Sequence, residues 1–223
     1  MSCWALEIDW VILSQVFGAV AQGAGAIVVA VAAIAGLNVW RNQLQGTKRQ
    51  AAAEDCLSHA YKLQYLIEIM RHPFAWPSEM AKVPKLDGET EEQHQARAHW
   101  GVAEVRFAPF ADDFAAMSSE RFKLQTLFGR EAREAFERLL GMVSKVRNSA
   151  VQAVGASRQV DFFNRKAEVS SAWQTQADNA QALLQKLERV VWGIGGDEDE
   201  FYGEVLSAVA ELEGYLKKDA AGV

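Results

Sequence analysis

The sequence is poor in cysteine and proline, and one long stretch of it carries no charge. Two cysteines among 223 residues, Cys3 and Cys56, provide neither a disulfide framework nor the spacing of a metal site. All four prolines fall between residues 73 and 109, which leaves the rest of the chain free to form helices. The net charge of −6, without a stripe of lysine and arginine, argues against nucleic acid as a partner.

The uncharged stretch extends from Val11 to Trp40 and is about 30 residues long. As a helix it would measure about 45 Å, enough to cross the hydrocarbon core of a bilayer and both interfaces. Trp10 and Trp40 stand at its ends, where an indole ring favours the headgroup level. We therefore predict a short N-terminus over residues 1–10, a transmembrane helix over residues 11–40 and a separate domain over residues 41–223.

A cleaved secretion signal is the alternative, because Ala33-Ile34-Ala35 resembles a signal peptidase site. Residues 1–10, however, contain acidic residues and no basic ones, unlike the start of a signal peptide. Basic residues follow the run, beginning with Arg41, so the positive-inside rule predicts an inner-membrane protein with its N-terminus outside and its C-terminal domain in the cytoplasm. The predicted membrane-interface anchors are Trp10, Trp40 and Arg41.

Two glutamines interrupt the uncharged run seven residues apart, and so they share one helix face. Small residues on that face would let two backbones approach, and the amides could hydrogen-bond across the gap. This predicts self-association or a partner helix. Snorkelling of Gln15 to the interface, or a water-filled path lined by the amides, would use the same pattern. The predicted association face comprises Gln15, Gly18, Ala19, Gln22, Gly25, Ala26, Ala33 and Gly36.

Beyond residue 41, apolar residues recur at alternating spacings of three and four, which predicts an all-α antiparallel helical bundle. A coiled coil with another chain would use the same pattern. Three stripes are expected to be buried: residues 130–155 with Ala132, Phe136, Leu139, Val143, Val146, Ala150 and Ala153; residues 162–193 with Val169, Trp173, Ala177, Ala180, Leu184, Leu187 and Val191; and Asp199–Lys218 with Tyr202, Leu206, Val209, Leu212 and Leu216.

Several residues predict breaks between these helices. His72-Pro73 should end the helix that begins at Arg41, and Gly46 should either hinge it or be tolerated within it. Residues 73–90 form the predicted loop, whose aromatic residues Phe74 and Trp76 we expect to pack on the bundle; an exposed docking site is the alternative. Further along, Pro109 predicts a kink or break, Ser119 a helix cap and Gly129 a helix stop.

Motifs that carry chemistry are scarce. His94 and His99 are five residues apart and do not share a helix face as a zinc pair would. The acidic string GGDEDEFYGE lacks the ligand spacing of a calcium loop, so we expect Gly195 and Gly196 to break the chain and Asp197 to cap the last helix. We find no nucleophile motif, nucleotide loop, cofactor fingerprint or metal site. An enzyme would need a site assembled by the fold, for example around Glu68, Asp112 and Asp113.

Three segments, WRNQLQGTKR, HAYKLQYLIEIMRHPF and LQTLFGREAREAFERLL, resemble a group of bacterial and phage-associated single-span proteins of about this length. The resemblance covers less than a quarter of the chain. It implies one span followed by a helical cytoplasmic domain, and it adds no catalytic residue.

Two hypotheses follow. The first is a non-enzymatic scaffold that sits in the lipid bilayer, forms homo-oligomers through its span and binds another protein with its cytoplasmic bundle. The second is a membrane-disrupting effector of the toxin or anti-phage type, in which several spans assemble into a pore and the bundle senses a trigger.

Overall fold

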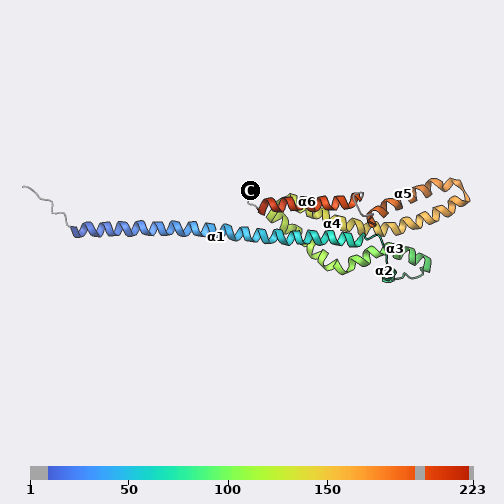
Figure 1. Cartoon of the computed structure of the whole chain (residues 1–223), viewed down its shortest axis with the longest axis horizontal. Coiled ribbons are helices and arrows are strands. Elements are labelled where there is room, and N and C mark those ends of the chain that lie inside the picture. The colour runs from blue at the N-terminus through green and yellow to red at the C-terminus, as the bar shows by residue number, and fades with distance from the viewer. Residues whose placement is uncertain (1–9, 194–198, 221–223) are drawn as a thin grey trace, which may run out of the picture. The chain divides into compact units, whose positions relative to one another are not determined.

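The computed structural model describes residues 10–193 and 199–220, with side chains at residues 29, 31–193 and 199–218. Every regular element among these residues is a helix, which confirms the predicted all-α bundle (Figure 1). The helices are α1 (Trp10–Met70), α2 (Pro77–Met80), α3 (Glu91–Phe107), α4 (Ala111–Val169), α5 (Gln174–Val191) and α6 (Glu200–Ala220), with short 3-10 turns at Ala108–Phe110 and Ser171–Trp173.

The chain divides into two compact units, Met1–Ala51 and Ala52–Val223. In the first unit, α1 runs without interruption through Gly46, so this glycine is tolerated within the helix rather than acting as a hinge. Every described side chain from residue 29 to residue 50 is exposed. No described residue of this unit belongs to a hydrophobic core. The part of this unit with described side chains is therefore an exposed helix.

The described residues of the second unit form two cores, and four helical segments, with Phe107 of α3, provide the side chains of the larger one. These segments, or arms, are residues 52–70 of α1, the two parts of α4 on either side of Gly129, and α6 (Figure 1). α6 runs antiparallel to α1, since Tyr61 contacts Glu213 whereas Arg71 contacts Asp199. Complete burial stabilises the fold by about 1.5–3 kcal/mol for each large apolar side chain. The largest such side chains here are Leu63, Leu66, Ile67, Met70, Phe136, Leu139, Leu212 and Leu216.

Gly129 lets α4 serve as two arms of this core. Its backbone has φ 89° and ψ −174°, a conformation that only glycine adopts readily. The chain reverses direction at this residue, so residues 111–128 and 130–147 lie side by side in the bundle (Figure 1). The predicted helix stop at Gly129 is thus confirmed as a sharp reversal.

The second core lies between α3, the later part of α4 and α5. The α4 residues that face it are mostly alanines, which allow close helix packing: Ala150, Ala153, Ala156 and Val160. Trp100 of α3 and Leu187 of α5 fill the space between the helices. α4 therefore contributes to both cores and fixes one relative to the other.

The predicted single stripe over residues 162–193 is wrong in its first part. α4 continues to Val169, and the chain turns back through Ser171–Trp173 before α5 begins. Val169 is 86% exposed and Trp173 is 39% exposed at this hairpin tip. The turn is stabilised by the side chain of Ser170, which accepts a hydrogen bond from the N–H of Ala172. The predicted burial of the later positions, from Ala177 to Val191, is confirmed.

Two other details differ from the prediction, and one agrees. Leu206 is 45% exposed, because Val205 faces the core in its place. Ser119 caps no helix; its hydroxyl donates to the carbonyl of Ala116 inside α4. The break predicted at Pro109 is confirmed, since this proline lies in the 3-10 turn between α3 and α4.

Substitution of Gly129 by alanine tests the reversal in α4. An alanine Cβ at this φ and ψ is strained, so Gly129→Ala should lower the free energy of unfolding by about 1–3 kcal/mol. The matched control is Gly141→Ala, at an exposed helical position where an added Cβ meets no atom within 4 Å. The control should stabilise by about 0.5–1 kcal/mol. Thermal unfolding followed by circular dichroism measures both; a G129A variant as stable as wild type would contradict the assignment.

Candidate functional site

Arg71, directly after α1, joins three helix ends where the two cores meet. Its side chain is only 3% exposed, and its Nη2 donates to the Asp199 carboxylate at 2.9 Å. The guanidinium also donates to two carbonyls at the end of α5, those of Arg189 (2.9 Å) and Val190 (2.8 Å). The carbonyl of Arg71 accepts from the N–H of Gly193 at 2.6 Å. This buried cation therefore holds the ends of α1 and α5 and the start of α6 together.

Asp199 has a second role as the cap of α6. The N–H of Tyr202 donates to the Asp199 carboxylate at 3.0 Å, which satisfies a backbone donor of the first helical turn. The sequence predicted Asp197 as this cap. Asp197, like Gly195 and Gly196, lies outside the described residues. Asp199 thus connects the capping of α6 to the Arg71 ion pair.

A second buried cation, Arg106 of α3, shapes the segment that follows α1. It donates to both carboxylate oxygens of Glu79, at 2.9 and 2.7 Å, and to the carbonyls of His72 and Phe74. These hydrogen bonds lower the pKa of the Glu79 carboxyl group. Arg106 therefore fixes the loop backbone and the short helix α2 against α3.

The predicted packing of Phe74 and Trp76 on the bundle is wrong. Phe74 is 56% exposed and Trp76 is 54% exposed, and their rings contact each other with centroids 4.8 Å apart. The physical reason is that the loop is fastened through its backbone carbonyls by Arg106, so its aromatic side chains need not be buried to order it. Both rings remain available to a partner.

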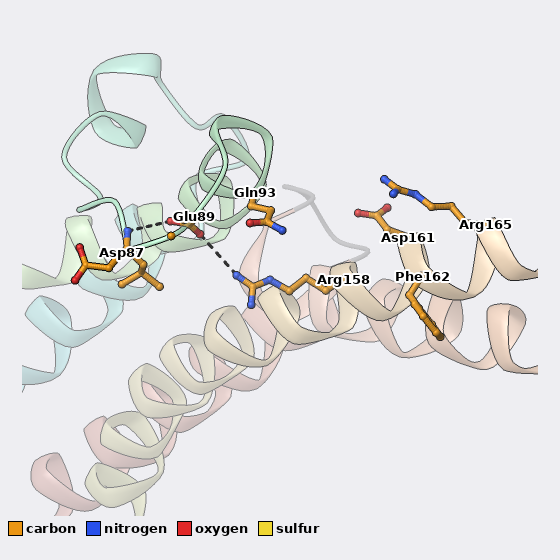
Figure 2. A pocket seen from close by; sticks show the side chains of 9 residues that line it. Asp87, Glu89, Gln93, Arg158, Asp161, Phe162 and Arg165 are labelled. Atoms are coloured by element: carbon orange, nitrogen blue, oxygen red, sulfur yellow. Dashed lines mark hydrogen bonds and ion pairs between the residues drawn. The ribbon is translucent and has the colours of Figure 1, made fainter.

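A groove of about 520 Å³ lies between the loop before α3 and the later part of α4. Figure 2 shows Arg158 reaching from α4 toward Glu89, with Asp161, Phe162 and Arg165 further along the same helix. Phe162 is 51% exposed. The nine lining residues are Leu86, Asp87, Gly88, Glu89, Gln93, Arg158, Asp161, Phe162 and Arg165.

Glu89 organises one wall of this groove. Its carboxylate accepts bonds from Nε and Nη2 of Arg97, at 2.8 and 2.7 Å, and from the N–H of Leu86 at 3.1 Å. Arg158 lies 3.7 Å from it and His94 lies 3.6 Å from it. The hydrogen bonds from Arg97 lower the pKa of Glu89 to about 2. His94 is therefore part of this ion-pair cluster.

The lining of the groove combines apolar and charged side chains. Its charged lining residues are the carboxylates of Asp87, Glu89 and Asp161 and the guanidinium groups of Arg158 and Arg165. It offers exposed Leu86 and Phe162 together with charges of both signs. Such a mixture of an apolar contact and a polar rim is typical of surfaces that bind another protein.

The other chemistry-bearing residues are dispersed. Burial, with the Glu120 carboxylate nearby, raises the pKa of the Cys56 thiol to about 12, which disfavours the reactive thiolate form. Glu120 also contacts Nδ1 of His59 at 2.5 Å. Among the described residues, no group of three histidine, cysteine or acidic side chains could hold a metal ion.

The three carboxylates considered for an enzyme site are not joined by any hydrogen bond or ion pair within the described residues. Glu68 contacts Gln64 and accepts from the hydroxyl of Tyr202. Asp112 and Asp113 are exposed in the first turn of α4. Glu68 therefore takes part in side-chain hydrogen bonds, and Asp112 and Asp113 lie on the surface at the start of α4.

The predicted association face and anchors fall in α1. Ala33, Gly36, Trp40 and Arg41 are exposed. The side chains of Trp10, Gln15, Gly18, Ala19, Gln22, Gly25 and Ala26 lie outside the described residues. Where side chains are described, no helix is long and apolar enough to cross a membrane. Residues 11–28, the greater part of the predicted span, do not belong to that described set.

No protein-family model, no curated protein and no solved structure matches the chain. The functional conclusions therefore depend on the residues themselves. The groove was not predicted from the sequence, since its walls come from residues about 70 positions apart. The sequence did contain one clue to the loop that forms a wall of the groove, since Pro84 and Gly88 are typical turn residues. Gly88 adopts φ 77°.

The Glu89 cluster predicts an acid-dependent loss of stability. A carboxyl group whose pKa is lowered in the folded chain stabilises it above the ordinary value of 4.5, and this is lost as the pH falls toward about 2. Glu89→Gln should therefore be less stable than wild type at neutral pH, and the difference should shrink between pH 4.5 and 2. Urea unfolding of both proteins across this pH range measures the difference in their free energies of unfolding. Glu168→Gln, at an exposed carboxylate, is the control. A difference in stability between wild type and Glu89→Gln that does not change with pH would contradict the stabilising role of the ionised Glu89.

Proposed function

We propose that the protein is a non-enzymatic scaffold of the inner membrane, anchored by one transmembrane helix over residues 11–40. Residues 1–10 lie outside, and residues 41–223 form a cytoplasmic bundle that binds another protein. Copies of the chain associate through the span. No cofactor, metal ion or nucleic acid enters this proposal.

The observation that carries the proposal is the exposed apolar character of α1. Seven large apolar side chains are exposed between residues 29 and 44, on all sides of the helix: Val29, Val31, Ile34, Leu37, Val39, Trp40 and Leu44. Leaving apolar surface in water costs about 25 cal/mol per Å². A helix that is apolar all round is normally buried in a large core or in a bilayer. The uncharged sequence from Val11 to Trp40 supports the bilayer.

The flanks of the run support the orientation. Asp9 precedes it, whereas Arg41 is the first charged residue after it, followed by Lys48 and Arg49. Cytoplasmic flanks carry the excess of basic residues. Trp10 and Trp40 would mark the two interfaces.

The small residues and amides of the run support self-association. Gln15 and Gln22, with Gly18, Gly25 and Gly36 on the same face, would let a second helix approach closely. Amide hydrogen bonds between helices contribute about 0.6–2 kcal/mol each in a membrane. Gly36 has free space for a Cβ, so packing within the chain does not require a glycine there.

The bundle supports a binding role. Its cores are filled by its own side chains, while the groove with Leu86 and Phe162 and the exposed pair Phe74 and Trp76 remain uncovered. Aromatic residues are enriched at protein interfaces, and partly apolar grooves suit the side chains of a partner. We propose this groove as the docking site.

Extraction of the full-length protein from its native membrane into polymer-bounded lipid discs tests the proposal. Mass measurement of the discs should give two or three copies of the chain and a second polypeptide in fixed ratio. A Gln15→Leu, Gln22→Leu variant should fall to one copy. Leu86→Ser with Phe162→Ser should lose the second polypeptide and keep the copy number.

Each part of the proposal has its own contrary result. Wild-type monomers would contradict association through the span, and a single polypeptide species would contradict the partner. A ring of about five or more copies would favour the pore-forming effector, because a single span per chain needs several copies to enclose water.

A further inference from the structure

Three basic residues follow the apolar part of α1 directly. Arg41, Lys48 and Arg49, here called the basic collar, lie within ten residues of Trp40, and all three side chains are exposed. No aspartate or glutamate occurs between Asp9 and Glu54. The collar is therefore a local positive charge in a chain whose net charge is −6.

The collar differs from most arginines of the second unit by having no partner. Arg71, Arg97 and Arg106 each donate to a carboxylate at 2.9 Å or less. For the collar, by contrast, no carboxylate of a described residue lies within ion-pair distance, and the nearest acidic residue along the chain is Glu54. Its guanidinium and ammonium groups are free to bind an external anion.

The helix geometry places two of these groups on one face. Arg41 and Lys48 are seven residues apart and so share a face, about 10 Å apart along the axis. Arg49 lies about 100° further around the helix. Trp40, which is 62% exposed, lies about 100° around the helix from Arg41, and Leu44, which is 43% exposed, lies about 40° from Lys48. The segment thus combines cations with apolar groups, a combination that fits a bilayer interface.

We propose that the basic collar binds the phosphate groups of anionic phospholipids in the cytoplasmic leaflet. The inference rests on the proposed membrane anchor and adds lipid selectivity to it. Arginine binds phosphate through parallel N–H donors, and lysine adds a mobile point charge. Each basic residue at an anionic surface increases affinity about fivefold, so three should give about a hundredfold preference for an anionic over a zwitterionic lipid.

A lipid fits better than a nucleic acid for two reasons. The collar has only three cations and lies beside apolar Trp40 and Leu44, which would contact acyl chains but not a phosphodiester backbone. The rest of the chain is acidic and would repel a longer polyanion.

The test uses the purified full-length protein in detergent, mixed with equal amounts of phosphatidylglycerol and phosphatidylcholine of matched acyl chains. Native mass spectrometry counts the lipids retained by each species. Wild type should retain phosphatidylglycerol in large excess. The variant Arg41→Gln, Lys48→Gln, Arg49→Gln should retain the two lipids about equally, since glutamine preserves the helix.

The matched control removes three exposed lysines elsewhere, with Lys62→Gln, Lys82→Gln and Lys218→Gln. It changes the net charge equally and should keep the wild-type preference. Equal retention of both lipids by wild type, or an unchanged preference in the collar variant, would overturn the inference. So would loss of the preference in the control, or tighter binding of single-stranded RNA than of phosphatidylglycerol vesicles.

Failure of the anchor itself is recognised separately by alkaline extraction of cell membranes. Wild type that stays in the pellet but shows no lipid preference refutes the collar alone. Wild type that is released into the supernatant refutes the membrane anchor, and with it the inference.

Discussion

The bundle depends on one helix, α4, which contributes side chains to both hydrophobic cores. One helix lines the larger core with Phe136, Leu139, Val143 and Val146, and then lines the smaller core with Ala150, Ala153 and Ala156. Without α4, the two cores would not be connected and each would be smaller. The Arg71–Asp199 ion pair closes the junction from the other side, by connecting the ends of α1 and α5 to the start of α6. Removing one member of such a buried pair typically costs about 3–5 kcal/mol, because the other charge stays buried.

The ion pairs of Arg106 and Glu89 also affect which side chains are exposed for binding a partner. Arg106 and Glu89 hold the segment between α1 and α3 through ion pairs and backbone carbonyls, and of its large apolar side chains Val83 is buried. Phe74, Trp76 and Leu86 therefore stay exposed on an ordered loop. Ordered, exposed apolar groups lose little conformational entropy on binding, which favours their use as contact residues.

The sequence predicted the helices well, because periodic burial along a helix needs only local information. The stripe from Ala132 to Ala153 is buried as predicted, with Gly129 before it as the stop. The errors arose where a distant residue decides the outcome. The exposure of Phe74 depends on a hydrogen bond from Arg106, more than 30 residues away, to the Phe74 carbonyl. The periodicity of apolar residues does not predict such a bond. Val169 and Trp173 continued an apolar spacing across a turn that the Ser170 side chain creates.

The site was harder to predict than the fold for the same reason. The walls of the groove come from residues 86–93 and 158–165, which share no motif. Residues 29–50 of α1 are the opposite case, since their exposure and charge follow directly from the order of residues. The proposal of a membrane anchor therefore rests on the sequence of residues 11–40 and on the exposed apolar side chains of α1.

The central claim is that this apolar part of α1 lies in lipid. Spin labels at residues 20, 31, 37, 44 and 50, one at a time in a Cys3→Ser, Cys56→Ala background, measure it in lipid nanodiscs. Collisions with oxygen should exceed those with a water-soluble nickel complex from residue 20 to residue 37, and the order should reverse by residue 50. Greater access of the nickel complex at every position would contradict the account.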